Sequence, residues 1–257
     1  MSRLWEHALR KVLGRRWSRS RLEPVGVILQ ACMSTGSVPG LMTQTAAGKS
    51  YLQHQLERVS VAFNRSDCVV VTTELRENQA VLQVCQDLRI PFYVGDRDDA
   101  LGNCMRAAQR QGFRSVMLLR SDSPLIDPAL LLQVMVKYLR LGDAANLVSN
   151  RLKRTYPVGM EVEITGLDSL VDSFLAASKL VDFSDPTLLL RRGDLSHCRT
   201  VDVVQAVDQS QWRFCLDTWA DHQQLSTLLE LVQKYSLHET MQVAEAHGLL
   251  VQQPQAG

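Results

Sequence analysis

The sequence predicts an α/β protein in which a mostly parallel sheet has helices on both faces. Short apolar runs rich in strand-forming residues alternate with helical patterns over the first 150 residues. Several of these runs are apolar almost throughout, which is typical of strands buried on both faces. The chain of 257 residues is long enough to bury a sizeable core, and it contains no internal repeat and no clear second domain.

The first half of the chain has the clearest elements. Residues 25–32 are expected to form a buried strand, and residues 49–63 a helix whose apolar side chains recur at helical spacing. The inner face of this helix is expected to contain Leu52, Leu56, Val59 and Phe63. Residues 68–73 form the second expected strand, which ends in two hydroxyl side chains. A helix over 74–88 and a strand over 91–95 repeat the unit.

The next unit begins with acidic residues that open a helix after residue 95, with Cys104, Met105 and Ala108 turned inward. A strand beginning at Val116 then runs into Asp122. The following helix is expected over roughly 128–140, because Pro128 is well suited to a first helical position.

The alternation weakens after the next expected strand, at 145–150. Residues 159–164 alternate, with Val162 and Ile164 on one face and Glu161 and Glu163 on the other. The remaining elements are helices over 168–177 and 186–191, strands over 200–204 and 212–217, and a terminal helix that begins at Thr218. The apolar stripe of that helix consists of Leu225, Leu228, Leu229 and Val232.

The composition indicates an ordinary globular protein. The chain is 46% hydrophobic and 21% charged with a net charge of +1, so nothing in it requires nucleic acid as a partner. No apolar run approaches the roughly 18 residues of a membrane span, and the N-terminus lacks the apolar core of a signal peptide. Six cysteines form no C-x-x-C pair, so we expect reduced thiols, no zinc site and a cytoplasmic location.

The first 24 residues differ from the rest, because they contain seven basic residues and two acidic ones. Their apolar residues fall at helical spacing opposite the arginines, which predicts a basic amphipathic helix. Residues 1–22 could dock on an anionic membrane surface or on a partner, or pack on the same domain or on a second subunit. The domain itself is expected over 25–250, followed by a tail over 251–257.

Two acidic residues, Asp122 and Asp217, each follow an expected strand. Ligands of open α/β sheets bind at the carboxyl ends of the strands, so the two carboxylates would converge there if their strands lie close together. One or two carboxylates suit a hard divalent cation that shares its other positions with water and substrate phosphates. The alternative is that Asp122 only caps a turn.

Other residues at the same edge suggest a nucleotide. The loop 33–41 is rich in Gly, Ser and Pro, and such loops let backbone N–H groups approach phosphates, although no Walker or G-x-G-x-x-G motif is present. Asp96 and Asp98 form the D-x-D motif with which many glycosyltransferases hold a metal-bound sugar nucleotide. Acidic residues are also favoured in a first helical turn for electrostatic reasons alone, so both interpretations remain open.

Taken together, the motifs resemble those of the spore-coat polysaccharide biosynthesis protein F family, within the cytidylyltransferases that also make CMP-sialic acid and CMP-3-deoxy-manno-octulosonate. The family motif Q-A-R-M-G-S-T-R-L-P-G-K corresponds to residues 30–41, and G-G-K-P to 47–50. The A-T-T motif corresponds to 71–73, G-S-E-D-D-V-L to 95–101, and G-D-C-P-L-I-D-P to 121–128. The later motifs V-S-N, P-x-G-x-D-V-E and L-T-L-D-T-P-E-D correspond to 148–150, 157–163 and 214–221.

The resemblance covers about residues 25–235 and implies a single α/β/α domain with the nucleotide-diphospho-sugar transferase fold. It also implies a homodimer formed through an insertion at about 151–205, which contributes to the sugar side of the site. The implied reaction is attack of a sugar-acid hydroxyl on the α-phosphorus of CTP, with Mg²⁺ as cofactor and pyrophosphate as the leaving group.

The resemblance also assigns roles to individual residues. Asp122 and Asp217 would hold Mg²⁺, and Lys49 would join them at the reacting phosphates. The nucleotide would be bound by Gln30, Ala31, Cys32, Met33, Gly40, Thr72, Thr73, Asp98 and Arg120. The sugar would be bound by Ser123, Asn150, Glu161 and Glu163.

Three cations of the family pattern are missing, because its loop arginines and lysine correspond to Cys32, Ser37 and Leu41. Each charge-assisted contact contributes roughly 1.5 to 3 kcal/mol, so their loss is expected to weaken triphosphate binding unless Lys49 and Arg120 compensate. The sequence therefore leaves three hypotheses. They are an active cytidylyltransferase, a non-catalytic homologue that binds a sugar nucleotide or a partner protein, and a glycosyltransferase that uses Asp96 and Asp98.

Overall fold

The computed structural model describes residues 25–32, 38–233 and 235–252. The expected N-terminal helix, Met33 and Ser37 lie outside the described residues. The described residues include no helix that is both long enough and apolar enough to cross a lipid bilayer.

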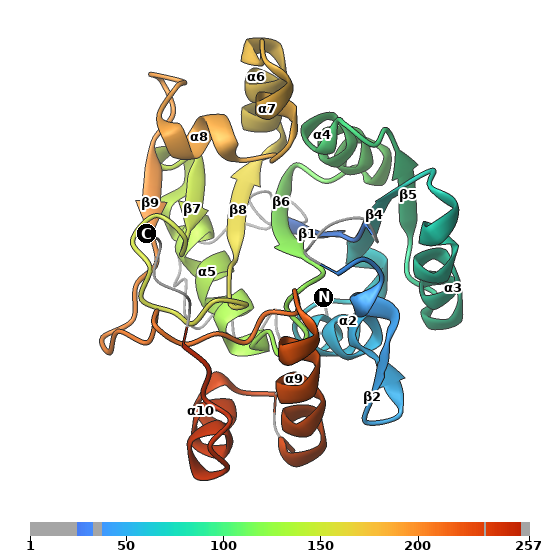
Figure 1. Ribbon diagram of the computed structural model, residues 1–257. Coiled ribbons are helices and arrows are strands. Elements are labelled where there is room, and N and C mark those ends of the chain that lie inside the picture. The colour runs from blue at the N-terminus through green and yellow to red at the C-terminus, as the bar shows by residue number, and fades with distance from the viewer. Residues whose placement is uncertain (1–24, 33–37, 234, 253–257) are drawn as a thin grey trace.

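A seven-stranded sheet forms the centre of the molecule (Figure 1). Its strand order is β5-β4-β1-β6-β8-β7-β9, and every neighbouring pair is parallel except those that involve β8. The strands are β1 (Val25–Gln30), β4 (Cys68–Thr73), β5 (Phe92–Gly95), β6 (Ser115–Arg120), β7 (Leu147–Ser149), β8 (Glu163–Gly166) and β9 (Thr200–Asp202). The mostly parallel sheet predicted from the sequence is therefore confirmed.

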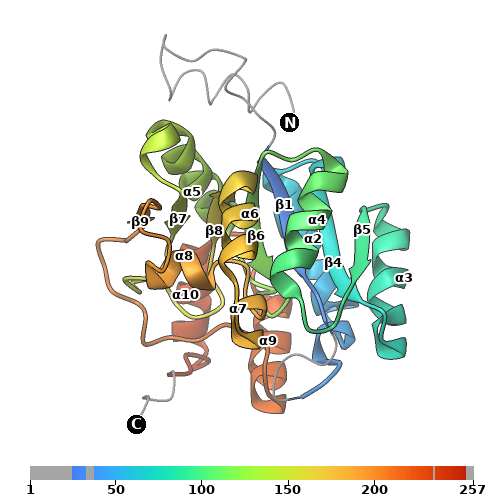
Figure 2. The ribbon, with the colours of Figure 1, turned by 90° about the horizontal axis from the view of Figure 1, so that it is seen from above.

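Helices cover both faces of this sheet, with α4 and α6 on one side of the strands and α2 and α9 on the other (Figure 1). In the view from above, α4 lies beside α6 (Figure 2). The α-helices of the described residues are α2 (Tyr51–Ala62), α3 (Gln79–Leu88), α4 (Ala100–Gln111), α5 (Pro128–Leu141), α6 (Leu167–Ala176), α7 (Leu180–Phe183), α8 (Leu188–Arg192), α9 (Trp219–Leu231) and α10 (Leu237–Ala246). A small hairpin of β2 (Thr45–Ala46) and β3 (Lys49–Ser50) precedes α2, and one-turn 3-10 helices lie at Leu41–Thr43, Arg65–Asp67, Arg76–Asn78 and Gly142–Ala144.

Alternate residues of the strands enter two separate apolar cores. In β1, Val27 and Leu29 join the core beneath α2 and α5, whereas Ile28 joins the core beneath α4 and α6. Strands buried on both faces have continuous apolar sequences for this reason, and β1 and β4 follow the rule. The predicted inner face of α2 is also confirmed, since all four of its apolar residues are buried.

The register brings the carboxyl ends of the central strands to one edge. Gln30 at the end of β1 lies opposite both Arg120 of β6 and Val71 of β4, and Thr73 lies opposite Gly95 of β5. Each of these strands leaves the sheet here and continues into a loop, so side chains from four loops can meet at this edge.

The prediction of a final strand over 212–217 is wrong. This segment makes only isolated bridges, Val158 to Arg213 and Trp212 to Gln252, outside the main sheet. Gly159 has a φ of 94°, and a Cβ at this position would lie 2.6 Å from the Phe214 carbonyl oxygen. Glycine thus lets the turn before β8 approach segment 212–217 and occupy its hydrogen-bonding groups, with Phe214 N donating to Val158 O at 2.8 Å.

Some expected boundaries also shift. The helix expected from Asp96 begins at Ala100, because the Asp99 carboxylate accepts a hydrogen bond from Gly102 N and caps it. The helix expected from Glu74 becomes a short 3-10 turn followed by α3. The sequence patterns did not indicate α10 as a separate helix.

Candidate functional site

A cavity of about 630 Å³ opens at the carboxyl edge of β1, β4 and β6. Its walls come from the ends of these strands, the loop after β5, the turn before β8 and the segment around α7. Of the residues assigned from the sequence, Gln30, Ala31, Cys32, Thr72, Thr73, Asp98, Arg120, Asp122, Glu161 and Glu163 line it. A volume of this size accommodates a nucleotide-sized ligand.

A second, much smaller cavity adjoins the first, and Arg120, Ser121 and Asp122 line both. Gly40 and Asp217 line only the smaller one. The two acidic residues that sequence analysis paired therefore both line the smaller cavity, and Asp122 lies where the two cavities meet.

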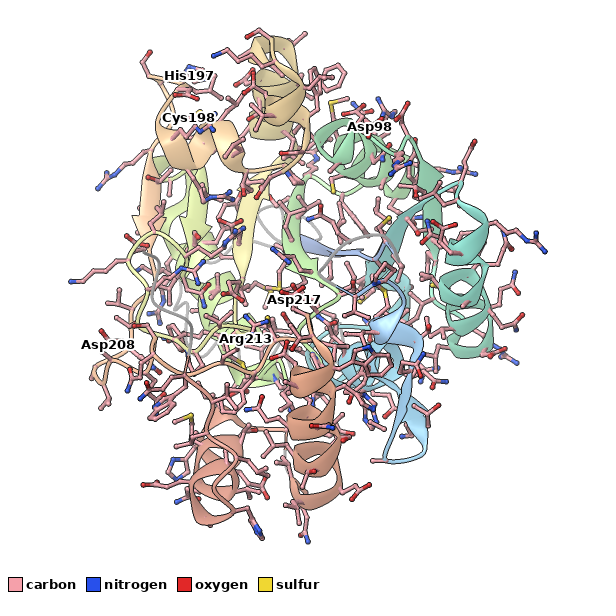
Figure 3. The ribbon with its side chains drawn as sticks, in the orientation of Figure 1. Asp98, His197, Cys198, Asp208, Arg213 and Asp217 are labelled. Carbon is pink, nitrogen blue, oxygen red and sulfur yellow. The ribbon has the colours of Figure 1, made fainter. Side chains whose placement is uncertain are left out.

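The proximity of Asp122 and Asp217 arises from a backbone contact. Leu216 N donates a hydrogen bond to the Asp122 carbonyl oxygen at 2.7 Å, which places Asp217 beside the turn that follows β6. Asp217 N in turn donates to the Asp221 carboxylate at 3.0 Å, within the capping box of α9. Figure 3 labels Asp217 and Arg213 near the start of α9, and Asp98 near α4.

Both carboxylates already have cationic neighbours. Arg120 Nη2 lies 2.5 Å from Asp122 Oδ2, and Ser123 Oγ donates to Asp122 Oδ1 at 3.0 Å. Arg213 Nη2 lies 3.6 Å from Asp217 Oδ2. The charge of Asp122 raises the pKa of Arg120 further above its ordinary value, with burial acting in the opposite direction.

These two carboxylates fit a magnesium-type ion, which takes further ligands from water and substrate, better than they fit a metal that is held by protein ligands alone. The described residues contain no group of three or more His, Cys, Asp or Glu side chains placed to hold a metal. Mg²⁺ usually keeps several waters and takes one or two carboxylates together with substrate phosphates. The donor set at the junction matches that preference.

The opposite wall presents hydroxyl groups. Asn78 Nδ2 donates to Thr73 Oγ1 at 2.8 Å and to the Thr73 carbonyl at 3.0 Å, which fixes the end of β4. Cys32 Sγ lies 3.7 Å from the same hydroxyl. Thr72 is only 1% exposed, and its Oγ1 has no hydrogen-bond partner among the described residues. A buried hydroxyl of this kind is costly unless a water or ligand satisfies it.

Asp96 and Asp98 also line the cavity, but Asp96 has a local structural role. Its carboxylate accepts from Asp98 N at 2.8 Å, and Asn103 holds its backbone at both N–H and C=O. These bonds are typical of a turn stabilised by Asx interactions. The geometry therefore favours a turn role for Asp96, whereas Asp98 lines the cavity just before α4.

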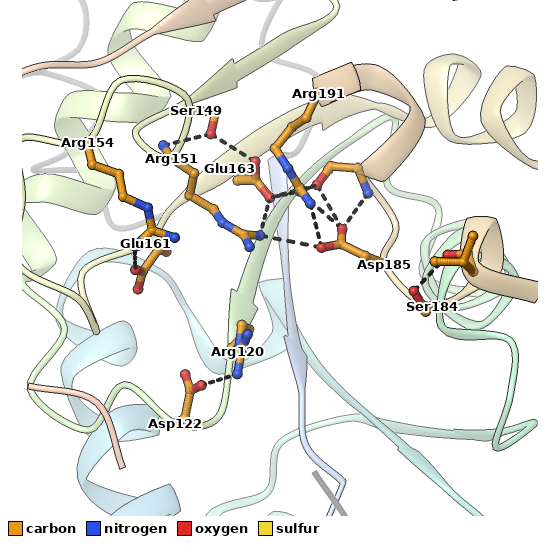
Figure 4. A network of polar contacts seen from close by, with 12 residues as sticks. Arg120, Asp122, Ser149, Arg151, Arg154, Glu161, Glu163, Ser184, Asp185 and Arg191 are labelled. Atoms are coloured by element: carbon orange, nitrogen blue, oxygen red, sulfur yellow. Dashed lines mark hydrogen bonds and ion pairs between the residues drawn. The ribbon is translucent and has the colours of Figure 1, made fainter. Parts of the chain in front are cut away.

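The part of the cavity wall around Glu163 and Asp185 contains a dense ion-pair network (Figure 4). Glu163 is 4% exposed, and its carboxylate accepts four hydrogen bonds within the described part of the chain. The donors are Ser149 Oγ at 2.8 Å, Arg151 Nη1 at 3.0 Å, Thr187 Oγ1 at 2.7 Å and Arg191 Nη1 at 2.9 Å. A buried carboxylate requires such partners, so Glu163 holds β7, β8 and the segment before α8 together.

Asp185 completes the network. Arg191 Nη2 donates to its Oδ2 at 2.7 Å, and Arg151 Nη1 lies 3.6 Å from the same oxygen. Burial alone would raise the pKa of Asp185, but the hydrogen bonds and charge of Arg191 outweigh it and lower the pKa to about 2. Sequence analysis missed Arg151, Asp185 and Thr187, because their pairing depends on loops far apart in the chain.

Among the assigned residues that the structure describes, three line neither cavity. Lys49, on the hairpin before α2, forms an ion pair with Glu57 of α2, with Lys49 Nζ 2.7 Å from Glu57 Oε2. Asn150 donates to Met160 O and accepts from Val162 N, so it fixes the turn before β8. Ser123 is buried beneath Asp122 and contacts it through its hydroxyl.

The cavity lining is acidic overall. It contains the three arginines Arg97, Arg120 and Arg151. It contains the six carboxylates Asp96, Asp98, Asp122, Glu161, Glu163 and Asp185. Lys49 lines neither cavity, so it does not add to these three arginines. Because carboxylates outnumber arginines in the lining, a bound triphosphate would depend strongly on added cations.

Comparisons of this architecture with solved structures find similar folds, and two of the three described below are named as a cytidylyltransferase and a CMP-sugar-acid synthetase. A cytidylyltransferase from Leptospira borgpetersenii superposes with a TM-score of 0.85 at 20% identity, covering 91% of this chain and 99% of that protein. A CMP-2-keto-3-deoxy-manno-octonic acid synthetase complexed with CTP has a TM-score of 0.59 at 15% identity and covers 81% and 99%. A Mycobacterium tuberculosis protein in complex with manganese has a TM-score of 0.50 at 17% identity and covers 79% and 97%.

The chain has the cytidylyltransferase fold. This confirms the predicted nucleotide-diphospho-sugar transferase architecture. No protein-family model matches the sequence, and no curated protein matches it. Function must therefore be argued from the site.

Proposed function

We propose that the protein is a Mg²⁺-dependent cytidylyltransferase that activates a sugar or sugar acid for surface polysaccharide or glycan biosynthesis. The observation that supports this most is the convergence of Asp122 and Asp217 at the edge of a nucleotide-sized cavity. Neighbours with the same fold include a CTP-bound synthetase and a manganese complex. The narrower resemblance to the spore-coat family belongs to the same proposal.

The positions of these residues support the following proposed roles. Gln30, Thr72 and Thr73 bind the nucleotide along the ends of β1 and β4, and Arg120 faces its phosphates. Glu161 and the network around Glu163 form the wall against which the acceptor sugar lies. Asp122 and Asp217 would hold Mg²⁺, which supplies charge neutralisation for the departing pyrophosphate. Catalysis of this kind consists mainly of positioning and charge stabilisation.

Pyrophosphate release tests the proposal directly. Purified protein is incubated with Mg²⁺, each nucleoside triphosphate and a panel of sugars and sugar acids, and CTP is expected to support release. Asp122→Asn should lower the rate on the order of a thousandfold, because it removes a charge from the metal site. Asp143→Asn, at an exposed residue in a 3-10 turn outside the cavities, is the matched control and should retain the wild-type rate.

The acidic lining and the missing loop cations favour one alternative, a non-catalytic homologue that binds a nucleotide or sugar nucleotide. No turnover with any triphosphate, together with a higher melting temperature in CTP or CMP, would support it. Sugar transfer from a sugar nucleotide that is lost in Asp98→Asn would instead support the glycosyltransferase hypothesis.

A further inference from the structure

Arg120 forms an ion pair with the carboxylate that the proposed metal needs. Its Nη2 lies 2.5 Å from Asp122 Oδ2, while Ser123 occupies the other carboxylate oxygen. Figure 4 shows this pair apart from the dashed contacts of the Glu163 network. Both oxygens of Asp122 thus have donors.

The backbone of Arg120 is fixed by hydrogen bonds, whereas its long side chain is largely exposed. Its carbonyl accepts from Gln55 Nε2 at 2.6 Å, and the next residue, Ser121, donates to Gln30 O at 3.0 Å. The Arg120 side chain is 58% exposed and lines both the large and the small cavity. A long side chain on a rigid strand end can change partners without moving the sheet.

A divalent cation and this guanidinium compete for Asp122 Oδ2. A magnesium-type ion binds a carboxylate oxygen at about 2.0 to 2.1 Å. A guanidinium that stays within hydrogen-bond distance of the same oxygen would lie close enough to the ion to repel it. A displaced guanidinium would remain in the large cavity, on the wall where phosphates of a nucleotide are proposed to lie. Phosphate oxygens are good acceptors for arginine.

We propose that Arg120 exchanges Asp122 for the phosphates of the nucleotide, so that the metal binds tightly only when the nucleotide is present. The inference rests on the metal site of the proposed function. It assigns Arg120 two alternating partners, the carboxylate in the free protein and the triphosphate in the complex. Free divalent cation is held weakly, because it must displace the arginine without offering it a new partner.

Binding of Mn²⁺, measured by electron paramagnetic resonance with and without CTP, tests this exchange. Arg120→Gln should bind Mn²⁺ alone on the order of tenfold more tightly than wild type, since it removes both the ion pair and a nearby positive charge. CTP should tighten Mn²⁺ binding in the wild type and do so several-fold less in Arg120→Gln. Asp122→Asn should lose this Mn²⁺ site.

Arg97→Gln is the matched control, because Arg97 lines the same cavity and makes no ion pair with Asp122. It should change the affinity for Mn²⁺ alone by less than about threefold, as expected for a more distant charge. The inference is overturned if Arg120→Gln binds Mn²⁺ alone no more tightly than wild type or Arg97→Gln, or if neither protein binds Mn²⁺. Tighter Mn²⁺ binding in Arg120→Gln without pyrophosphate release would support the exchange and reject the proposed catalysis.

Discussion

Asp185 shows how a single residue of the cavity wall contributes to the stability of the fold. Its carboxylate is held by Arg191 and by Thr187 N, and its pKa lies near 2 instead of the ordinary 3.8. A group whose pKa is lowered on folding stabilises the folded state above its unfolded pKa. This contribution is lost as pH falls through the folded value. The relevant window is therefore about pH 4 to 2.

We expect the free energy of unfolding of Asp185→Asn at pH 6 to be about 2 kcal/mol lower than that of wild type, because the charged partner of Arg191 is removed. The variant should therefore unfold at a lower denaturant concentration. The difference should shrink toward zero at pH 2, where wild-type Asp185 is about half protonated or more. Chemical denaturation at several pH values measures it, with Asp143→Asn as an exposed control. A gap that stays constant between pH 6 and pH 2 would contradict this origin of the stability.

At the scale of residues, the sequence predicted the parts of the site that follow strand ends. Thr72 and Thr73 line the cavity because they form the carboxyl end of β4, and Asp122 lines it because it lies in the turn that follows β6. Arg151 and Asp185 could not be predicted in this way, since the ion pair between them depends on how two irregular loops fold. Lys49 was assigned to the phosphates from its position in the sequence, but the structure pairs it with Glu57, which lies about two turns into the adjacent helix.

At the scale of elements, the position of Asp217 depends on a close contact between two irregular segments. The turn before β8 touches segment 212–217 at Gly159, where a side chain would meet the Phe214 carbonyl. Segment 212–217 then continues to Leu216, which bonds to the Asp122 carbonyl. The sequence indicated a strand here because a short, mostly apolar run ends in an acidic residue, but such a run does not specify whether a segment joins the sheet.

Gly159→Ala tests this dependence. We expect it to lower the free energy of unfolding by at least about 2 kcal/mol, because it combines a positive φ with a clash against backbone. It should also weaken Mn²⁺ binding, since Asp217 loses its fixed position. Gly112→Ala is the control, with a φ of 70° and no atom within 4 Å of the added Cβ. If the two variants are equally stable in urea, close contact at Gly159 does not determine this arrangement.

At the scale of the whole molecule, the alternation of strands and helices predicted the parallel half of the sheet well. Each of β1, β4, β5 and β6 is followed by a helix that returns the chain from the carboxyl edge of the sheet to its amino edge, where the next parallel strand begins. The antiparallel insertion of β8 between β6 and β7 was not predictable, because strand order is set by tertiary packing and leaves no local pattern. This insertion nevertheless brings Glu163 to the cavity.

The second half of the chain also presents apolar side chains to solvent, which leads to a prediction about assembly. Leu175 is 77% exposed at the end of α6, and Leu180 is 84% exposed at the start of α7. Both lie within the segment 151–205 that is expected to form a dimer interface, and Leu180 also lines the cavity. Exposed large apolar residues close together commonly mark an interface.

We therefore expect light scattering to give a mass of about twice the 28.8 kDa of one chain. The double variant Leu175→Ser and Leu180→Ser should shift the protein toward the monomer, because it removes apolar area from the interface. Val61→Ser, at a half-exposed apolar residue of α2, is the matched control and should stay dimeric. A monomeric wild type at micromolar concentration, or a dimer unchanged in the double variant, would place these leucines outside any interface. If the dimer forms as expected, Leu180 links assembly to the cavity, so the double variant should also bind CTP more weakly than the Val61→Ser control.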